Sequence, residues 1–135
     1  MNNLKFPYLW LSIGVFLVLS VVFVSLMPHP PHAGHFRNSD KVGHFVAYMA
    51  MTFWFVQIYA NNLIRLRIAL AFVILGVVME CLQRLSGFRT FEYADMAANA
   101  AGVLCALILA HTPLSRVLGA VERAMLRLIN EPAGA

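Results

Sequence analysis

The segment Leu9–Leu26, LWLSIGVFLVLSVVFVSL, decides the fold class because it runs for 18 residues without a charged side chain. A helix needs ~20 mostly apolar residues to cross the hydrocarbon core of a bilayer. Three further apolar segments follow it. We therefore predict four membrane-spanning helices, at about Pro7 to Met27, Val42 to Ala60, Ile68 to Leu85 and Ala94 to Ala110.

The composition also indicates a membrane protein. Hydrophobic residues make up 61% of the 135 residues and charged residues 12%, with a mean hydropathy of +0.74. A soluble domain carries roughly 25% charged and 45–50% apolar residues. A single small domain cannot bury so much apolar surface, so lipid must solvate it. Cys81 and Cys105 lie inside apolar runs without metal-like spacing and should pack as small hydrophobes.

A cleaved signal peptide is the alternative for the first segment. Its apolar run is longer than the usual core of ~7–15 residues. The residues that follow, from Met27 to Pro30, contain no A-x-A-like cleavage site. We therefore expect the first segment to remain as a transmembrane helix.

The connectors differ in character. Residues 28–38, PHPPHAGHFRN, are too rich in proline and glycine for a helix. Residues 61–67 are expected to form a tight basic turn, and residues 86–93 a polar loop. His29, His32 and His35 recur at every third residue, but no carboxylate or thiolate interrupts the repeat. We predict a solvated loop there and no metal.

The C-terminal segment has a different periodicity. From Leu114 to Ile129, apolar residues recur at helical spacing and arginines occupy the remaining surface. This pattern predicts an amphipathic helix on the membrane surface. The fold class is therefore all-α: a polytopic membrane domain over residues 1–111, and a surface helix with a short tail over residues 112–135.

The basic residues predict the orientation. Short cytoplasmic connectors carry an excess of Lys and Arg. In a four-helix topology one side holds Lys5, Arg65, Arg67, Arg116, Arg123 and Arg127, and the other holds Arg37, Lys41, Arg84 and Arg89. The second group is mixed with acidic residues. We expect an inner (plasma) membrane protein with both termini in the cytoplasm. The scattered charges do not form the basic face of a nucleic-acid-binding protein.

Polar residues gather at the outer end of the predicted bundle. Asp40, His44 and Tyr48 share one helical face through i, i+4 spacing. The start of the second segment, the end of the third and the start of the fourth meet at this face. Ionisable groups inside a bilayer cost roughly 2.5–3.5 kcal/mol and indicate function. The predicted site comprises His44, Glu80 and Asp95 as catalytic candidates and Asp40, Lys41, Tyr48, Gln83, Arg89 and Asn99 as binding residues.

Each of these residues also has a structural interpretation. Asp95 and Asp40 could cap helix N-termini. Glu80 could pair with Arg89 or Lys41. Asn99 could bridge two helices by a hydrogen bond, beside a close-packing stripe that contains Gly102. The convergence of so many polar residues at one face favours a shared site.

The order and spacing of these residues resemble the VanZ-like family of bacterial membrane proteins. The motif reads D-K-x2-H-x3-Y, E-x2-Q, R and D-x3-N-x2-G, and it spans about Asp40 to Gly102. This chain has Gly87-Phe88 where the family often has Pro-Gly before the arginine. The resemblance implies a multi-helix membrane protein of the cell envelope and a link to resistance against a glycopeptide antibiotic, teicoplanin. It implies no particular biochemical activity.

Three functions fit the sequence. The first is a site that binds or modifies an anionic lipid head group or a lipid-linked cell-envelope precursor, with Lys41 and Arg89 on phosphate. The second is a non-catalytic membrane scaffold whose polar residues are structural. The third is a small proton-coupled transporter. No cofactor is expected, and whether the protein is an enzyme or an oligomer stays open.

Overall fold

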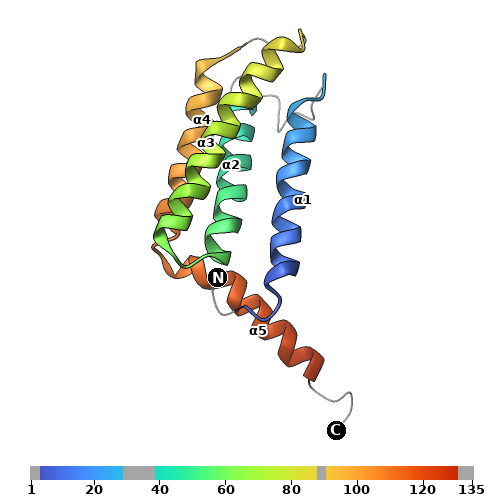
Figure 1. Ribbon diagram of the computed structural model, residues 1–135, viewed down its shortest axis with the longest axis vertical. Coiled ribbons are helices and arrows are strands. Elements are labelled where there is room, and N and C mark those ends of the chain that lie inside the picture. Colours follow the sequence, from blue (N-terminus) through green and yellow to red (C-terminus); the bar gives the residue numbers. More distant parts are fainter. Residues whose placement is uncertain (1–3, 29–38, 88–90, 131–135) are drawn as a thin grey trace.

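The computed structural model describes residues 4–28, 39–87 and 91–130, and these residues form helices without any strand (Figure 1). The helices are α1 (Pro7–Ser25), α2 (Ser39–Ile58), α3 (Asn62–Leu85), α4 (Tyr93–Leu109), a short 3-10 helix η1 (Pro113–Arg116) and α5 (Val117–Asn130). The predicted all-α fold is therefore confirmed.

Helices α1 to α4 lie side by side as a bundle, and α5 leaves it at an angle (Figure 1). The bend between α4 and the segment Pro113–Asn130 is 80°. Because successive helices run in opposite directions, the start of α1 and the start of α5 come together at one end. The start of α2, the end of α3 and the start of α4 meet at the opposite end, as the sequence predicted.

Two helices, α1 and α3, are long and apolar enough to cross a membrane, and the bent pair of α4 with Pro113–Asn130 could count as a third span. The prediction of four spans is not confirmed. Polar residues such as Lys41, His44 and Gln57 lower the mean hydropathy of α2, and α4 has only 17 residues. Large apolar side chains on the outer faces of α1 and α3, such as Phe16 and Leu70, are exposed, which suits contact with lipid.

Two predicted boundaries were wrong. Residues 61–67 do not form a turn, because α3 already begins at Asn62. The side chain of Asn61 caps α3 by accepting hydrogen bonds from the backbone N–H groups of Leu63 (2.8 Å) and Ile64 (3.2 Å). The C-terminal amphipathic segment is also not one helix, because it begins with the 3-10 turn η1.

The closest approach in the bundle is between α2 and α4. A Cβ atom added at Gly102 would lie 2.3 Å from the carbonyl oxygen of Phe45 and 2.9 Å from the amide nitrogen of Met49. Only a residue without a side chain permits the two backbones to come this close, as at the small-residue interfaces of membrane helices. The predicted close-packing stripe is therefore confirmed at Gly102.

The chain's two distant ends are joined by Glu122 of α5. Its carboxylate accepts hydrogen bonds from the backbone N–H groups of Lys5 (2.7 Å) and Phe6 (2.9 Å) and from Nε1 of Trp10 (2.8 Å). Lys5 and Phe6 directly precede α1, and Phe6 is its N-cap residue, so Glu122 fixes the segment that leads into α1. Burial alone would raise the pKa of Glu122, but the hydrogen bonds from Lys5, Trp10 and Phe6 outweigh it and hold the pKa below its usual value of 4.5.

We expect Gly102→Ala to lower the free energy of unfolding by about 1–3 kcal/mol, because the added methyl group forces α2 and α4 apart. The measurement is unfolding of the purified protein in mixed detergent micelles. The matched control is Gly43→Ala, where an added Cβ meets no atom within 4 Å. A Gly102→Ala protein as stable as the wild type would contradict the close approach.

A second prediction concerns pH. A carboxyl group whose pKa is lower in the folded state stabilises the fold above its unfolded pKa, and this contribution disappears as the pH falls through the folded pKa. We therefore expect the junction of α1 and α5 to weaken below about pH 4.5. The weakening is measured as a change in Trp10 fluorescence with pH, recorded in a Trp54→Phe background. Glu122→Gln should remove this transition, and a transition that persists in Glu122→Gln would assign it to another group.

Candidate functional site

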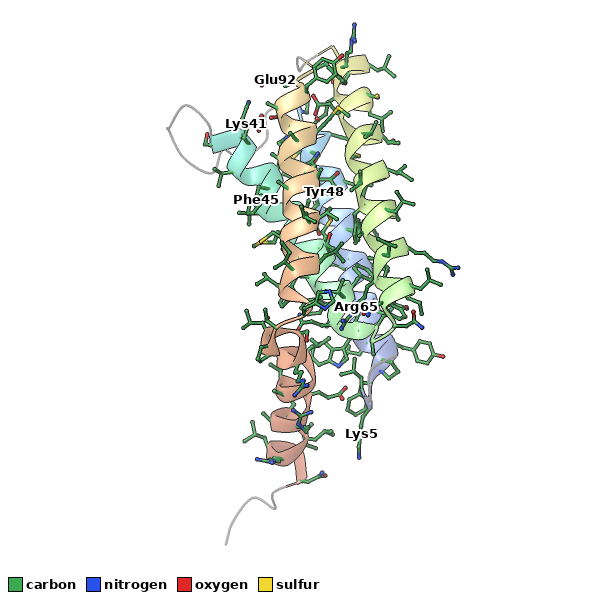
Figure 2. All side chains as sticks on the ribbon, turned by 90° about the vertical axis from the view of Figure 1, so that its left-hand side faces the viewer. Lys5, Lys41, Phe45, Tyr48, Arg65 and Glu92 are labelled. Atoms are coloured by element: carbon green, nitrogen blue, oxygen red, sulfur yellow. The ribbon has the colours of Figure 1, made fainter. Side chains whose placement is uncertain are left out.

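Seven residues form what we call the polar cluster, at the end of the bundle away from α5. They come from the start of α2, the end of α3, and the start of α4 with the residue before it: Asp40, Lys41, His44, Glu80, Glu92, Asp95 and Asn99. Figure 2 shows Lys41 and Glu92 near this end, whereas Lys5 and Arg65 lie toward the other end.

His44 lies at the centre of the polar cluster. Its Nδ1 is 3.1 Å from Oδ1 of Asn99. Since an amide oxygen only accepts hydrogen bonds, this contact places a proton on Nδ1. Nε2 lies 3.8 Å from Oδ2 of Asp95 and 4.0 Å from Oδ1 of Asp40. Asn99 of α4 therefore holds one nitrogen of the imidazole, while the other nitrogen faces two carboxylates.

Lys41 supplies the positive charge. Its Nζ lies 2.6 Å from Oε2 of Glu92 and 3.4 Å from Oδ1 of Asp95. The Lys41 side chain is 33% exposed, whereas that of Asp95 is only 4% exposed. The ammonium group therefore links a buried carboxylate to the surface of the bundle.

Glu80 is buried at the end of α3. Its Oε1 accepts a hydrogen bond from the backbone N–H of Glu92 at 2.7 Å. Its other oxygen, Oε2, is buried and has no hydrogen-bond partner in the part of the chain that the structure describes. Of the two partners expected for Glu80, Lys41 pairs with Glu92 and Asp95 instead, and Arg89 lies outside the described residues.

Among the described residues, two carboxylate oxygens of the polar cluster are buried without a hydrogen bond. Oδ1 of Asp95 still has the ion pair with Lys41 at 3.4 Å, whereas Oε2 of Glu80 has no partner in these ranges. A buried polar atom without a partner costs about 1–3 kcal/mol. A molecule that brings hydroxyl or ammonium donors, or a cation, would therefore bind favourably here.

A metal ion is one such cation. One ligand atom each from Asp40, His44 and Asp95 lies within 4.8 Å of the other two. Carboxylate and imidazole ligands together suit ions such as Mn²⁺ or Zn²⁺. The three histidines for which no metal was expected, His29, His32 and His35, lie outside the described residues.

Three predicted site residues remain, namely Tyr48, Gln83 and Arg89. Tyr48 is buried in the hydrophobic core with Met51 and Phe72. Gln83 donates a hydrogen bond from Nε2 to the carbonyl oxygen of Ser25 at 2.8 Å and so ties α3 to the end of α1. Arg89 lies outside the described residues.

The expected capping role of Asp95 is not observed. Glu92 occupies the N-cap position of α4, and no side chain makes a cap hydrogen bond there. The buried carboxylate of Asp95 instead faces Lys41 and His44. The expected bridging hydrogen bond of Asn99 is confirmed by its contact with His44.

Glu92 is the member of the polar cluster that the sequence analysis missed. Its carboxylate accepts a hydrogen bond from Nζ of Lys41, and its backbone N–H donates one to Oε1 of Glu80. A signal existed, because Glu92 precedes Asp95 by three residues and so can lie on the same face at the start of α4.

No family model, curated protein or solved structure matches this chain. The VanZ-like resemblance therefore stays a prediction that rests on the motif alone.

Proposed function

We propose that the protein is a VanZ-like integral membrane protein whose polar cluster binds a phosphate-bearing lipid head group or lipid-linked cell-envelope precursor. The observation that carries this proposal is the buried, acceptor-rich arrangement of Asp95, His44 and Glu80 at one end of an apolar bundle. Buried ionisable groups among membrane helices mark ligand pathways and sites. If the VanZ-like resemblance holds, tolerance of glycopeptide antibiotics would be one consequence of such binding.

The roles of the residues follow from their contacts. Lys41 reaches the surface, and its ammonium group can donate hydrogen bonds to a phosphate. Oδ1 of Asp95 would accept a hydrogen bond from a hydroxyl or ammonium group of the head group. Nε2 of His44 would take up or release a proton if the ligand is modified.

The sign of the charge restricts the ligand further. Asp40, Glu80, Glu92 and Asp95 all lie at this end, and together they repel a bare phosphate. The ligand should therefore carry hydroxyl or amino groups beside its phosphate, or bind together with a divalent cation held by Asp40, His44 and Asp95.

A membrane scaffold is the second candidate, and the ion pairs favour it. Lys41 of α2 is already paired with Glu92 and Asp95, and Gln83 joins α3 to α1. Such links hold helices together without any ligand.

The membrane topology is part of the proposal. We infer four spans with both termini in the cytoplasm of the inner membrane. A helix of 17 residues such as α4 is about 26 Å long, nearly the thickness of the hydrocarbon core. Lys5, Arg65, Arg67, Arg116, Arg123 and Arg127 all lie at the α5 end, which is the distribution that the positive-inside rule associates with the cytoplasm.

The binding proposal is tested with a photoactivatable polyprenyl phosphate together with Mn²⁺ in phosphatidylcholine nanodiscs, because this lipid carries no hydroxyl or amino group beside its phosphate and so needs the divalent cation. We expect saturable cross-linking to residues 39–48 or 92–99. Asp95→Asn, Lys41→Gln and His44→Ala should each reduce it about tenfold, the loss of one charge-assisted contact. The control is Arg84→Gln at the same end, whose guanidinium lies over the ring of Phe91 and should not affect cross-linking.

The thermal stability of each variant distinguishes the two candidates. Variants that fold stably but no longer cross-link support the binding site. Destabilised variants, together with a wild type that shows no saturable cross-linking, would establish the scaffold in its place.

Topology is tested by single cysteines in a Cys81→Ser, Cys105→Ser background. We expect a thiol reagent that cannot cross membranes to label Ser86→Cys in intact cells, and Arg127→Cys only after permeabilisation. The reverse pattern would show that the orientation is inverted, and labelling of both in intact cells would exclude a spanning α4.

A further inference from the structure

A cleft of about 400 Å³ lies at the α5 end of the molecule, away from the polar cluster. Three arginines line it: Arg65 from α3, Arg116 from η1 and Arg123 from α5. Gln57, at the end of α2, and Gly119 also line it. Figure 2 shows Arg65 close to where the bundle meets α5.

The structure fixes one of the three guanidinium groups in place. Nε of Arg65 donates hydrogen bonds to the carbonyl oxygens of Tyr59 (2.7 Å) and Val56 (3.0 Å). Its Nη1 lies 3.5 Å from the carbonyl oxygen of Ala110. Arg65 therefore holds the ends of α2 and α4 together and sets the inner wall of the cleft.

Among the described residues, no neighbouring acid neutralises the positive charge of the cleft. Within the described residues, Arg116 and Arg123 make no salt bridge. The acidic residue beside them, Glu122, is turned to the start of α1, where Lys5, Phe6 and Trp10 bind its carboxylate. Several positive charges in one cleft raise the local concentration of anions there.

The cleft has space for a ligand because position 119 is glycine. An added Cβ there would meet only Nη1 of Arg123, at 3.4 Å. A larger side chain would occupy part of the cleft while keeping all three positive charges.

The position of the cleft indicates the source of the anion. On α5, the side chains of Val117, Val121, Met125 and Leu128 form an exposed apolar face. A helix with one apolar and one basic face lies in the plane of a membrane, with the basic groups at the level of the lipid phosphates. Basic pockets beside membrane helices on the cytoplasmic side bind anionic head groups.

We propose that the cleft between α5 and the ends of α2 and α3 is a binding site for the phosphate group of an anionic lipid, held by Arg65, Arg116 and Arg123. This site is separate from the polar cluster and serves the opposite leaflet. It would fix α5 on the membrane surface through one bound lipid, beyond the general attraction of a basic helix.

The test measures phosphatidylglycerol binding to the purified full-length protein by native mass spectrometry, with phosphatidylcholine for comparison. The double variant Arg116→Gln, Arg123→Gln should bind phosphatidylglycerol about thirtyfold more weakly. Both side chains are exposed, so the variant should fold. The control for a single lost charge, Arg127→Gln, removes one positive charge from α5 outside the cleft and is compared with Arg116→Gln alone. It should change binding less than about twofold.

A second variant separates shape from charge. Gly119→Leu keeps every arginine and fills the cleft, so it should weaken binding about as strongly as the double variant. If Arg127→Gln weakens binding as much as Arg116→Gln alone, and Gly119→Leu binds normally, a diffuse charge effect explains the data and the proposed site is wrong.

The source of the phosphate is settled by competition. Phosphatidylglycerol that stays bound in excess inorganic phosphate supports a lipid site. Displacement of the lipid by inorganic phosphate at millimolar concentration would assign the cleft to a soluble phosphate ligand and overturn the lipid assignment.

Discussion

The contact between the backbones of α2 and α4 at Phe45 and Gly102 governs the rest of the structure. It brings the two helices closer than any side chain would permit. His44 and Asn99 lie within one turn of this contact, and their hydrogen bond forms at 3.1 Å because the helices are already close. Asp95 and Lys41 lie further along the same two helices. An interface built for packing therefore also determines where the ionisable groups meet.

The two ends of the bundle differ in their balance of hydrogen-bond donors and acceptors. At the polar cluster, the carboxylates of Glu92 and Asp95 share the ammonium group of Lys41, and Oε2 of Glu80 is buried without a hydrogen bond among the described residues. At the α5 end, the carboxylate of Glu122 has three donors, while arginines remain without acidic partners within the described ranges. A deficit of donors at one end and an excess at the other give the molecule two unlike surfaces, suited to two unlike ligands.

Helix type, number and approximate position could be predicted from the sequence, because the lengths of the apolar runs and the positions of the charges are read directly from the order of the residues. So could the meeting of Asp40, His44, Asp95 and Asn99, since i, i+4 spacing and an alternating topology place them at one end. The start of α3 was missed because the cap at Asn61 outweighs the turn-like appearance of residues 61–67. The partners of Gln83 and Glu122 depend on the relative rotation and depth of helices far apart in the chain, which periodicity does not encode.

The junction at Glu122 also has a consequence for biosynthesis. Translation proceeds from the N-terminus, so α1 leaves the ribosome before α5, and the carboxylate that binds the residues leading into α1 lies more than a hundred residues later in the chain. Until α5 is made, the N–H groups of Lys5 and Phe6 therefore lack this partner. They gain it only when α5 has been synthesised and has folded back onto α1, so the contact reports that the helices between them have been assembled.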